Sequence, residues 1–420
     1  MGYEHLTIAT ADLDNTILLA PKSFELSTVF LSDKNLPTEE IIEKVKENMA
    51  KNHLHDYTKK RFFYRASFTQ KYPKMDFGFQ KSSIETIDKR LIDSLAQSFP
   101  KQFSYFFETV CELYGNHEPE FKLDILRALN LEDETQATTF TGFQEKMEQL
   151  LKDNVKPNSY LKVKSGIVGT KVPLDSIIED QKVKDARRKR YETIEYFNYR
   201  KQSVHQVLDN LFYQKKSEID VIQNQGRYEF KLTEYQEIGE NLAYVLTFEP
   251  KWRADFKGKI YINTEDFAVL RLTYENAKPV YDKLFNMFGI NANKIGYRGT
   301  MLFEKKPDGF YHIKYGNQEL VESFAIKRPL RIIEKNKFVR GRRKQNEVKL
   351  ELDLKMYNII KRELVVYKNT AVTASTVENY KENKKVQLHK ATAYDPDFWK
   401  GYTVLEPNQM IREYKAVGTE

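Results

Sequence analysis

The residue pattern most suggestive of catalysis is a histidine and a glutamate with two residues between them, His117 and Glu120. Zinc carboxypeptidases use such a pair with a later histidine, because zinc binds neutral imidazole and carboxylate at an open site. His205 or His312 would be the third ligand. However, a proline lies inside the motif, and a chain with seven histidines matches this spacing about 0.6 times by chance. We therefore favour a solvent-exposed loop over a zinc peptidase site.

A second group of candidate ligands, His53, His55 and Asp56, stands near the predicted end of a helix. Protonated histidines at such a position complement the helix dipole, and we prefer this interpretation to a metal site. The chain also lacks the GxSxG elbow of serine hydrolases and the glycine-rich loops that bind nucleotide phosphates. Its single cysteine, Cys111, excludes a CxxC metal site and an intramolecular disulfide. We therefore predict no catalytic residue, no metal and no cofactor.

The strongest concentration of charge is a basic stretch between residues 327 and 344. Only Phe338 is interleaved with these charges, whereas a nucleic-acid surface needs several aromatic side chains for stacking or a groove-reading module. We therefore expect no nucleic-acid partner. Two interpretations stay open, a solvated connection in the β region or contact with an anionic surface such as lipid headgroups. The residues predicted for that contact are Lys327, Arg328, Arg331, Arg340, Arg342 and Arg343.

The composition is that of a globular protein, since 40% of the 420 residues are hydrophobic and 30% are charged. The 27 phenylalanines and 26 tyrosines can bury ample surface, which argues against disorder. No apolar run approaches the roughly 18 to 20 residues of a membrane-spanning helix, so we expect no transmembrane helix. The net charge of +8 favours acidic partners without requiring one. The N-terminus shows no export signal, which fits either the cytoplasm or a chain that starts after its signal.

Hydrophobic spacing predicts helices in much of the first half of the chain. A helix over residues 39–52 follows Pro37 and carries two glutamates in its first turn, where the helix dipole favours them. A strand is expected over residues 61–68. Residues 80–155 are predicted to be mainly helical, with helices over 84–95, 103–113, 121–131 and 143–151.

From about residue 218 the pattern changes to that of antiparallel strands. The clearest hairpin joins residues 301–303 and 310–313 through the turn Lys306-Pro307-Asp308-Gly309. Together with the helices of the first half, these strands predict an α+β fold.

Several segments share a pattern that recurs in one protein family. They are residues 39–52, 61–65, 256–271, 328–337, 344–347, 395–402 and 406–408. Together they resemble Bacteroidetes envelope proteins known as carboxypeptidase-like regulatory-domain-containing proteins. The family name refers to a non-catalytic β-sandwich and implies no peptidase activity. The β half also resembles lipoprotein-carrier folds, which implies a large curved antiparallel sheet with a packed helix.

The resemblance implies a division of the chain. Residues 1–25 would be the last strands of a truncated β-sandwich, and residues 26–79 a linker, a helix and the first strand of the main domain. Residues 80–183 would be a mainly helical insertion, and residues 184–420 an antiparallel β region with a C-terminal tail. The missing export signal would then reflect truncation.

The leading functional hypothesis is a non-enzymatic binding or scaffolding protein of the cell envelope, in the periplasm or at the outer membrane. Its partner would be a lipid, a lipoprotein or an outer-membrane protein held against the curved sheet. One alternative is the zinc-dependent peptidase built on His117 and Glu120. Another is a protein- or glycan-binding module that uses exposed aromatic side chains near Trp252 or Trp399.

Overall fold

The structure is a computed structural model of the whole chain. It describes residues 36–132, 142, 145–146, 149–156, 158–166, 168–173, 195–251, 254–281, 289–339, 344–406 and 411. The predicted β-sandwich remnant at residues 1–25 lies outside the described residues.

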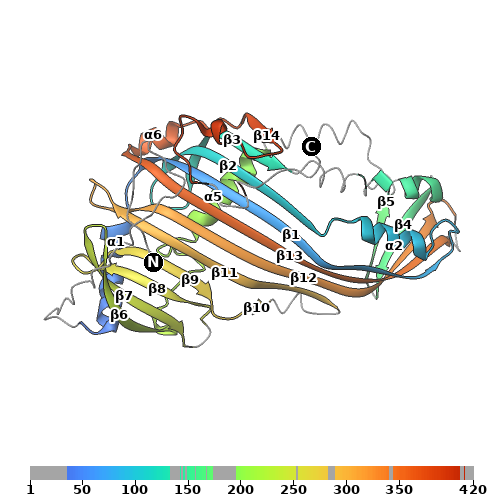
Figure 1. The fold of residues 1–420 in the computed structure, drawn as a ribbon, viewed down its shortest axis with the longest axis horizontal. Helices are drawn as coiled ribbons and strands as arrows, with labels where there is room; N and C mark the ends of the chain where they lie inside the picture. Colours follow the sequence, from blue (N-terminus) through green and yellow to red (C-terminus); the bar gives the residue numbers. More distant parts are fainter. Residues whose placement is uncertain are drawn as a thin grey trace, which may run out of the picture.

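Fourteen strands among the described residues form one large curved sheet (Figure 1). The strand order is β14-β3-β2-β1-β13-β12-β11-β9-β8-β7-β6, with β10 beside β11 and the β4–β5 hairpin beside β12. All of these pairs are antiparallel except β14 with β3. The predicted α+β fold with a large curved antiparallel sheet is therefore confirmed. The strands are β1 Thr58–Ser82, β2 Gln102–Gly115, β3 Phe121–Glu132, β4 Ser159–Ser165, β5 Val168–Pro173, β6 Tyr228–Ile238, β7 Asn241–Pro250, β8 Phe256–Asn263, β9 Val269–Asn276, β10 Val280–Tyr281, β11 Ile290–Lys305, β12 Tyr311–Asn336, β13 Lys344–Ala371 and β14 Leu388–Ala391.

Three long strands, β1, β13 and β12, run side by side through the middle of the sheet. They contain 25, 28 and 26 residues, and a 25-residue strand extends for about 80 Å. These strands connect two ends of the sheet that carry different helices and strands. One end carries α1 and the strands β6 to β9, and the other carries α2, β4 and β5 (Figure 1). The sheet also continues across the boundaries predicted near residues 80 and 184.

Two helices, α1 and α5, pack against the hydrophobic core of the sheet, whereas α2 lies at the opposite end from β6 to β9 (Figure 1). The predicted helix over residues 39–52 is confirmed as α1, Thr38–His53, whose Ile41, Ile42 and Val45 are buried. This helix and α5 contribute to one hydrophobic core with strands β1 to β3, β6 to β9, β11 and β12. The Asn52 side chain ties α1 to the β8–β9 turn by donating to the Asp266 carbonyl at 2.8 Å. The other helices are α2 Lys89–Ser98, α5 Tyr196–Asp209 and α6 Ala374–Asn379, with 3-10 turns at Gln225–Arg227 and Pro396–Trp399.

The prediction of helices over residues 103–113 and 121–131 is wrong, because these residues form β2 and β3. The cause is burial on both faces of β2. Cys111 belongs to the main core, whereas Phe106 and Val110 pack on the other face, against a cluster that includes Trp399. A strand covered on both faces is almost continuously apolar, so it loses the alternation that distinguishes a strand from a helix. Residues 80–183 are therefore not mainly helical in the part that the structure describes.

Gly258 in β8 lies where the sheet leaves no room for a side chain. A Cβ atom there would collide with the Thr273 carbonyl oxygen of β9 and would lie 2.9 Å from the Phe248 ring. We expect Gly258→Ala to destabilise the protein by about 1–3 kcal/mol, because a carbonyl in a paired strand cannot move aside. Urea unfolding monitored by circular dichroism measures the effect. Gly226→Ala is the control, since nothing lies within 4 Å of its Cβ position, and equal midpoints for the two variants would contradict the prediction.

Candidate functional site

The two faces of the long strands differ in chemistry at the α2 end of the sheet. The sequence from Val348 to Met356 alternates strictly between apolar and charged residues, so one face of β13 is apolar and the other is charged. The pairing with β12 and β1 keeps most like residues together, with Leu350 opposite both Leu330 and Phe79, and Arg328 opposite Leu352 is the charged exception. We call this surface the apolar face. It consists of Met75, Phe77, Phe79, Phe324, Ile326, Leu330, Ile332, Val348, Leu350, Leu352, Leu354 and Met356.

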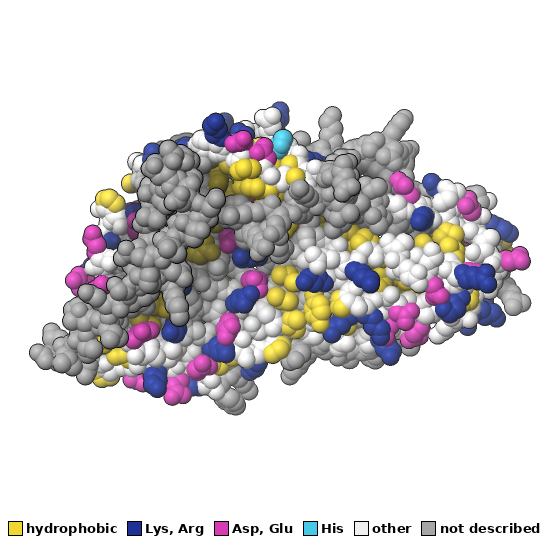
Figure 2. Space-filling model, in the orientation of Figure 1, with side chains coloured by type: hydrophobic (Ala, Val, Ile, Leu, Met, Phe, Trp, Pro, Cys, Tyr) yellow, Lys and Arg dark blue, Asp and Glu magenta, His cyan; other side chains and the backbone are white. Residues whose placement is uncertain are grey.

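Most side chains of the apolar face are only half-buried. In Figure 2, hydrophobic side chains lie in several patches along the long strands, with charged side chains between and beside them. The opposite face carries ion pairs such as Lys74 with Asp353, whose charged atoms are 2.7 Å apart. A half-buried apolar surface of this length is unusual for a sheet that only faces water, and it indicates a binding surface.

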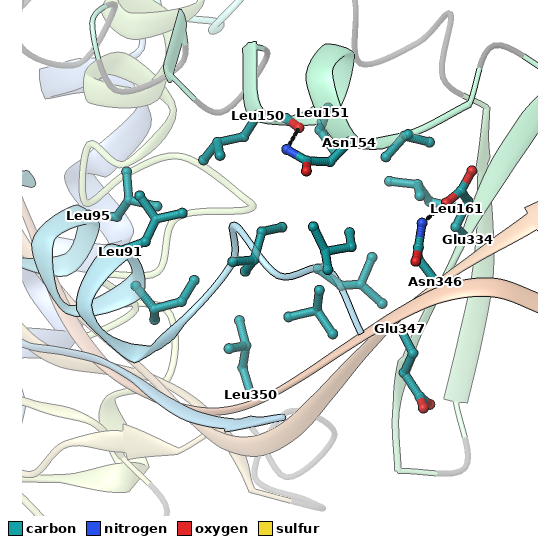
Figure 3. A pocket seen from close by; sticks show the side chains of 16 residues that line it. Leu91, Leu95, Leu150, Leu151, Asn154, Leu161, Glu334, Asn346, Glu347 and Leu350 are labelled. Carbon is teal, nitrogen blue, oxygen red and sulfur yellow. Dashed lines mark hydrogen bonds between the residues drawn. The ribbon is translucent and has the colours of Figure 1, made fainter. Parts of the chain in front are cut away.

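The apolar face ends in a cavity of about 100 Å³. Helix α2 lies on one side of the cavity with Leu91 and Leu95, and Leu150 and Leu151 lie across from them, above Leu350 (Figure 3). The cavity is similar in scale to the engineered cavities of about 150 Å³ that stay dry and bind benzene. The lining residues are Ile84, Ile87, Leu91, Ile92, Leu95, Leu150, Leu151, Asn154, Val155, Leu161, Ile332, Glu334, Asn346, Glu347, Val348 and Leu350.

Local sequence explains why α2 covers this cavity. Asp88 caps the helix, because its side chain accepts a hydrogen bond from the Leu91 amide at 2.8 Å. The helix therefore starts later than the predicted residue 84. Leu91, Ile92 and Leu95 then fall on one side of the helix, since residues three and four apart share a face.

The polar residues at the edge of the cavity are already hydrogen-bonded within the protein. Glu334 accepts from the Lys156 amide at 2.9 Å, the Ser159 hydroxyl at 2.7 Å and the Asn346 side chain at 2.7 Å. Glu347 is paired with Arg331 and Lys344, which lower the pKa of its carboxyl group against the smaller effect of burial. The cavity therefore offers apolar contacts, and its polar groups have their partners without a ligand.

The basic residues predicted to contact an anionic surface lie next to this region. Arg331 pairs with Glu347, the Arg328 guanidinium donates to the Ser165 carbonyl at 2.8 Å, and Lys327 lies 3.8 Å from Asp353. The other three residues of the predicted set, Arg340, Arg342 and Arg343, lie outside the described residues. Contact with an anionic surface stays a prediction.

The histidines proposed as zinc ligands are only partly brought together. The His117 imidazole lies 2.9 Å from the carbonyl of His55, and the His55 ring stacks on His312 with ring centroids 4.1 Å apart. His205 instead lies beside the ring of Phe121. Within the described ranges, no group of three or more histidine, cysteine, aspartate or glutamate side chains is arranged to hold a metal ion.

What the histidines form is a buried cluster around Lys60. Burial and the neighbouring Lys60 lower the pKa of His55 to about 2 and that of His312 to about 4. Burial also lowers the pKa of His53 to about 3 and that of Lys60 to about 7. The Lys60 ammonium nitrogen lies 3.3 Å from His55 Nε2, and His312 Nε2 lies 2.8 Å from Asp308. The imidazoles are therefore neutral in the folded core. The spacing of residues in the sequence had not indicated that Lys60 belongs to this cluster.

Of the two tryptophans named for the binding-module alternative, the structure describes Trp399. Trp399 is 2% exposed and donates a hydrogen bond to Glu108 at 2.7 Å, so the expectation that it is exposed is wrong. Trp252 lies outside the described residues. In the described part of the chain, no helix is long and apolar enough to span a bilayer.

Comparisons with known proteins give structural likenesses alone. No family model and no curated protein matches the sequence. A LolA superfamily protein from Nitrosomonas europaea is 10% identical with a TM-score of 0.18, over 81% of this chain and 97% of that chain. A putative outer membrane lipoprotein-sorting protein domain from Vibrio parahaemolyticus is 8% identical with a TM-score of 0.21, over 81% and 96%. The MucA/MucB complex of Pseudomonas aeruginosa gives 6% identity and a TM-score of 0.18, over 81% and 96%.

The resemblance to the Bacteroidetes family stays a prediction. The chain is a large curved antiparallel sheet with an apolar face and an apolar cavity.

Proposed function

We propose that this protein is a non-enzymatic binding protein that holds the hydrocarbon part of a lipid or lipoprotein on its apolar face. The observation that carries the proposal is the cavity under α2, which continues the apolar face and is lined mostly by leucine, isoleucine and valine. Binding of a hydrocarbon chain to such a surface is favourable, because removing apolar groups from water lowers the free energy. The polar groups at the edge of the cavity are already hydrogen-bonded within the protein, so they do not bind a polar substrate.

The proposed setting is the cell envelope, in the periplasm or at the outer membrane. This part of the proposal rests on the resemblance to envelope proteins and on the apolar face, which suits a protein that carries hydrocarbon chains through water. Antibody detection in fractionated cells tests it. Recovery of the protein in the cytoplasmic fraction alone would contradict it.

Binding is tested with a neutral ligand, so that charge plays no part. We expect dodecanol to raise the melting temperature of the protein, and native mass spectrometry after gentle purification to show bound phospholipid. Leu91→Trp places a larger side chain in the cavity and is expected to weaken dodecanol binding about tenfold, which corresponds to 1.4 kcal/mol.

The matched control is Leu126→Trp, because Leu126 is 36% exposed on β3 and takes no part in the cavity. Its affinity for dodecanol should equal that of the wild type. The proposed function would be overturned if the wild-type protein purified without lipid and its melting temperature did not rise with dodecanol or phospholipid.

A further inference from the structure

Arg200 of α5 is a buried cation that has no counter-charge among the described residues. Its side chain is 8% exposed, and its Nε and Nη1 atoms have no hydrogen-bond partner. The guanidinium carbon lies 4.0 Å from the centroid of the Phe107 ring, which supplies a cation–π contact. Within the described ranges, no carboxylate forms an ion pair with Arg200.

In the part of the chain that the structure describes, a second arginine on the same face of the sheet is also held by neutral groups alone. Arg362 of β13 donates to the side-chain oxygens of Gln318 at 3.0 Å and Gln206 at 2.5 Å, and to the Ser203 hydroxyl at 3.3 Å. No carboxylate among the described residues pairs with it either. Two guanidinium groups in this region therefore have no carboxylate partner among the described residues.

The two arginines converge on Tyr64. Ser203 is three residues after Arg200 on α5 and so lies on the same side of the helix. Its hydroxyl contacts Arg362 and also lies 2.6 Å from the Tyr64 hydroxyl. The Arg200 guanidinium lies over the Phe107 ring, Phe107 pairs with Ala66, and Ala66 pairs with Arg362, so the two arginines lie over neighbouring strands. Burial raises the pKa of Tyr64, and both Arg362 and Arg200 act against that rise.

A buried charge with no partner costs several kcal/mol, so a protein that keeps one usually has a counter-ion for it. We propose that Arg200 and Arg362 bind an oxyanion, a carboxylate or a phosphate. Arginine suits this role, because its planar donors match the oxygens of both groups. The Ser203 and Tyr64 hydroxyls add two further hydrogen-bonding groups to the site.

This oxyanion site is separate from the cavity of the proposed function. Arg362 and Leu350 are twelve residues apart on β13, which corresponds to about 40 Å along the strand. The residues beside Arg362 on the same face are Ile360, Leu320 and Phe68, which pair across β13, β12 and β1. This geometry fits an oxyanion from either of two sources, a lipid headgroup or a free ion.

Four probes distinguish the sources: dodecanoate, dodecyl phosphate, acetate and inorganic phosphate. We expect at least one of them to raise the melting temperature of the wild-type protein. Arg200→Met and Arg362→Met should each weaken that binding about tenfold or more, since each removes a charge-assisted contact. Without an anion, Arg200→Met should melt no lower than the wild type, because it removes an unpaired buried charge.

The control is Arg298→Met, whose guanidinium is exposed and pairs with Glu319 at 2.8 Å. Its response to the probes should match that of the wild type. Stabilisation by the chain-bearing probes alone assigns the site to a headgroup, and equal stabilisation by acetate or phosphate assigns it to a free ion. No stabilisation by any probe, or full stabilisation in both arginine variants, would overturn the proposal. Dodecanol reports on the cavity separately, so a failure of one site is distinguishable from a failure of the other.

Discussion

Glu108→Ala is expected to destabilise the protein by about 3–5 kcal/mol, because it leaves the Arg65 charge buried with its main partner removed. Glu108 is fully buried, and Arg65 is 3% exposed. The Arg65 guanidinium lies 2.7 Å from the Glu108 carboxylate and also donates to the carbonyl oxygens of Leu405 and Glu406. The same carboxylate accepts the hydrogen bond of the Trp399 indole.

This substitution therefore acts on the attachment of the C-terminal segment as well as on the sheet. Trp399 is one of two tryptophans, so its fluorescence in a Trp252→Phe background reports on this segment during urea unfolding. Glu319→Ala, which removes the partner of an exposed arginine, should cost less than about 1 kcal/mol. Replacing both Arg65 and Glu108 by apolar residues should lower the free energy of unfolding less than Glu108→Ala does. Equal unfolding midpoints for Glu108→Ala and Glu319→Ala would contradict the expectation.

Acid is expected to destabilise the protein well above the pH at which carboxylates titrate. The pKa of His53, His55 and His312 lies near 3, 2 and 4 in the folded protein, against an ordinary value of 6.5. The unfolded chain therefore binds more protons than the folded chain below pH 6.5, and stability is lost as the pH falls from about 6.5 towards 4. At pH 5 each histidine contributes a loss of about 2 kcal/mol, from 1.36 kcal/mol per pH unit.

Urea unfolding at pH 7 and at pH 5 measures this loss. His312→Gln should reduce the difference between the two pH values, whereas His389→Gln should leave it unchanged, because His389 is exposed. Equal stability at pH 7 and pH 5 would show that these imidazoles are accessible to protons in the folded state.

The strands beyond residue 228 were predictable, because most of them alternate between apolar and polar residues as a half-buried sheet requires. The hairpin around residues 306–309 is confirmed as the β11–β12 turn, with the Gly309 amide bonded to the Lys306 carbonyl. Strands β2 and β3 were missed because tertiary packing covers both faces of β2. Nothing local in the residues around Phe106 records the C-terminal segment that packs on them, since Trp399 is almost 300 positions away.

The candidate sites were less predictable than the fold. The alternation from Val348 to Met356 is visible in the sequence and is the signal that leads to the apolar face. The cavity forms where α2 and residues 149–155 contact the ends of β12 and β13. The spacing of apolar residues along the sequence does not predict this contact. Arg200 and Arg362 stand out only because the structure shows no carboxylate paired with them among the described residues. Their charges are unremarkable among 68 lysines and arginines.

The pairing of β1 with β13 also determines the order in which the protein can fold. Thr58 pairs with Gly115 of β2 on one side and with Ala371 of β13 on the other, so the second edge of β1 waits for a partner more than 300 residues further along the chain. During synthesis at about 5–20 residues per second, β1 would leave the ribosome roughly 15–60 seconds before β13. Contacts this distant in sequence slow folding, and an unpaired strand edge invites aggregation. We expect the nascent chain to depend on chaperones until β13 is complete.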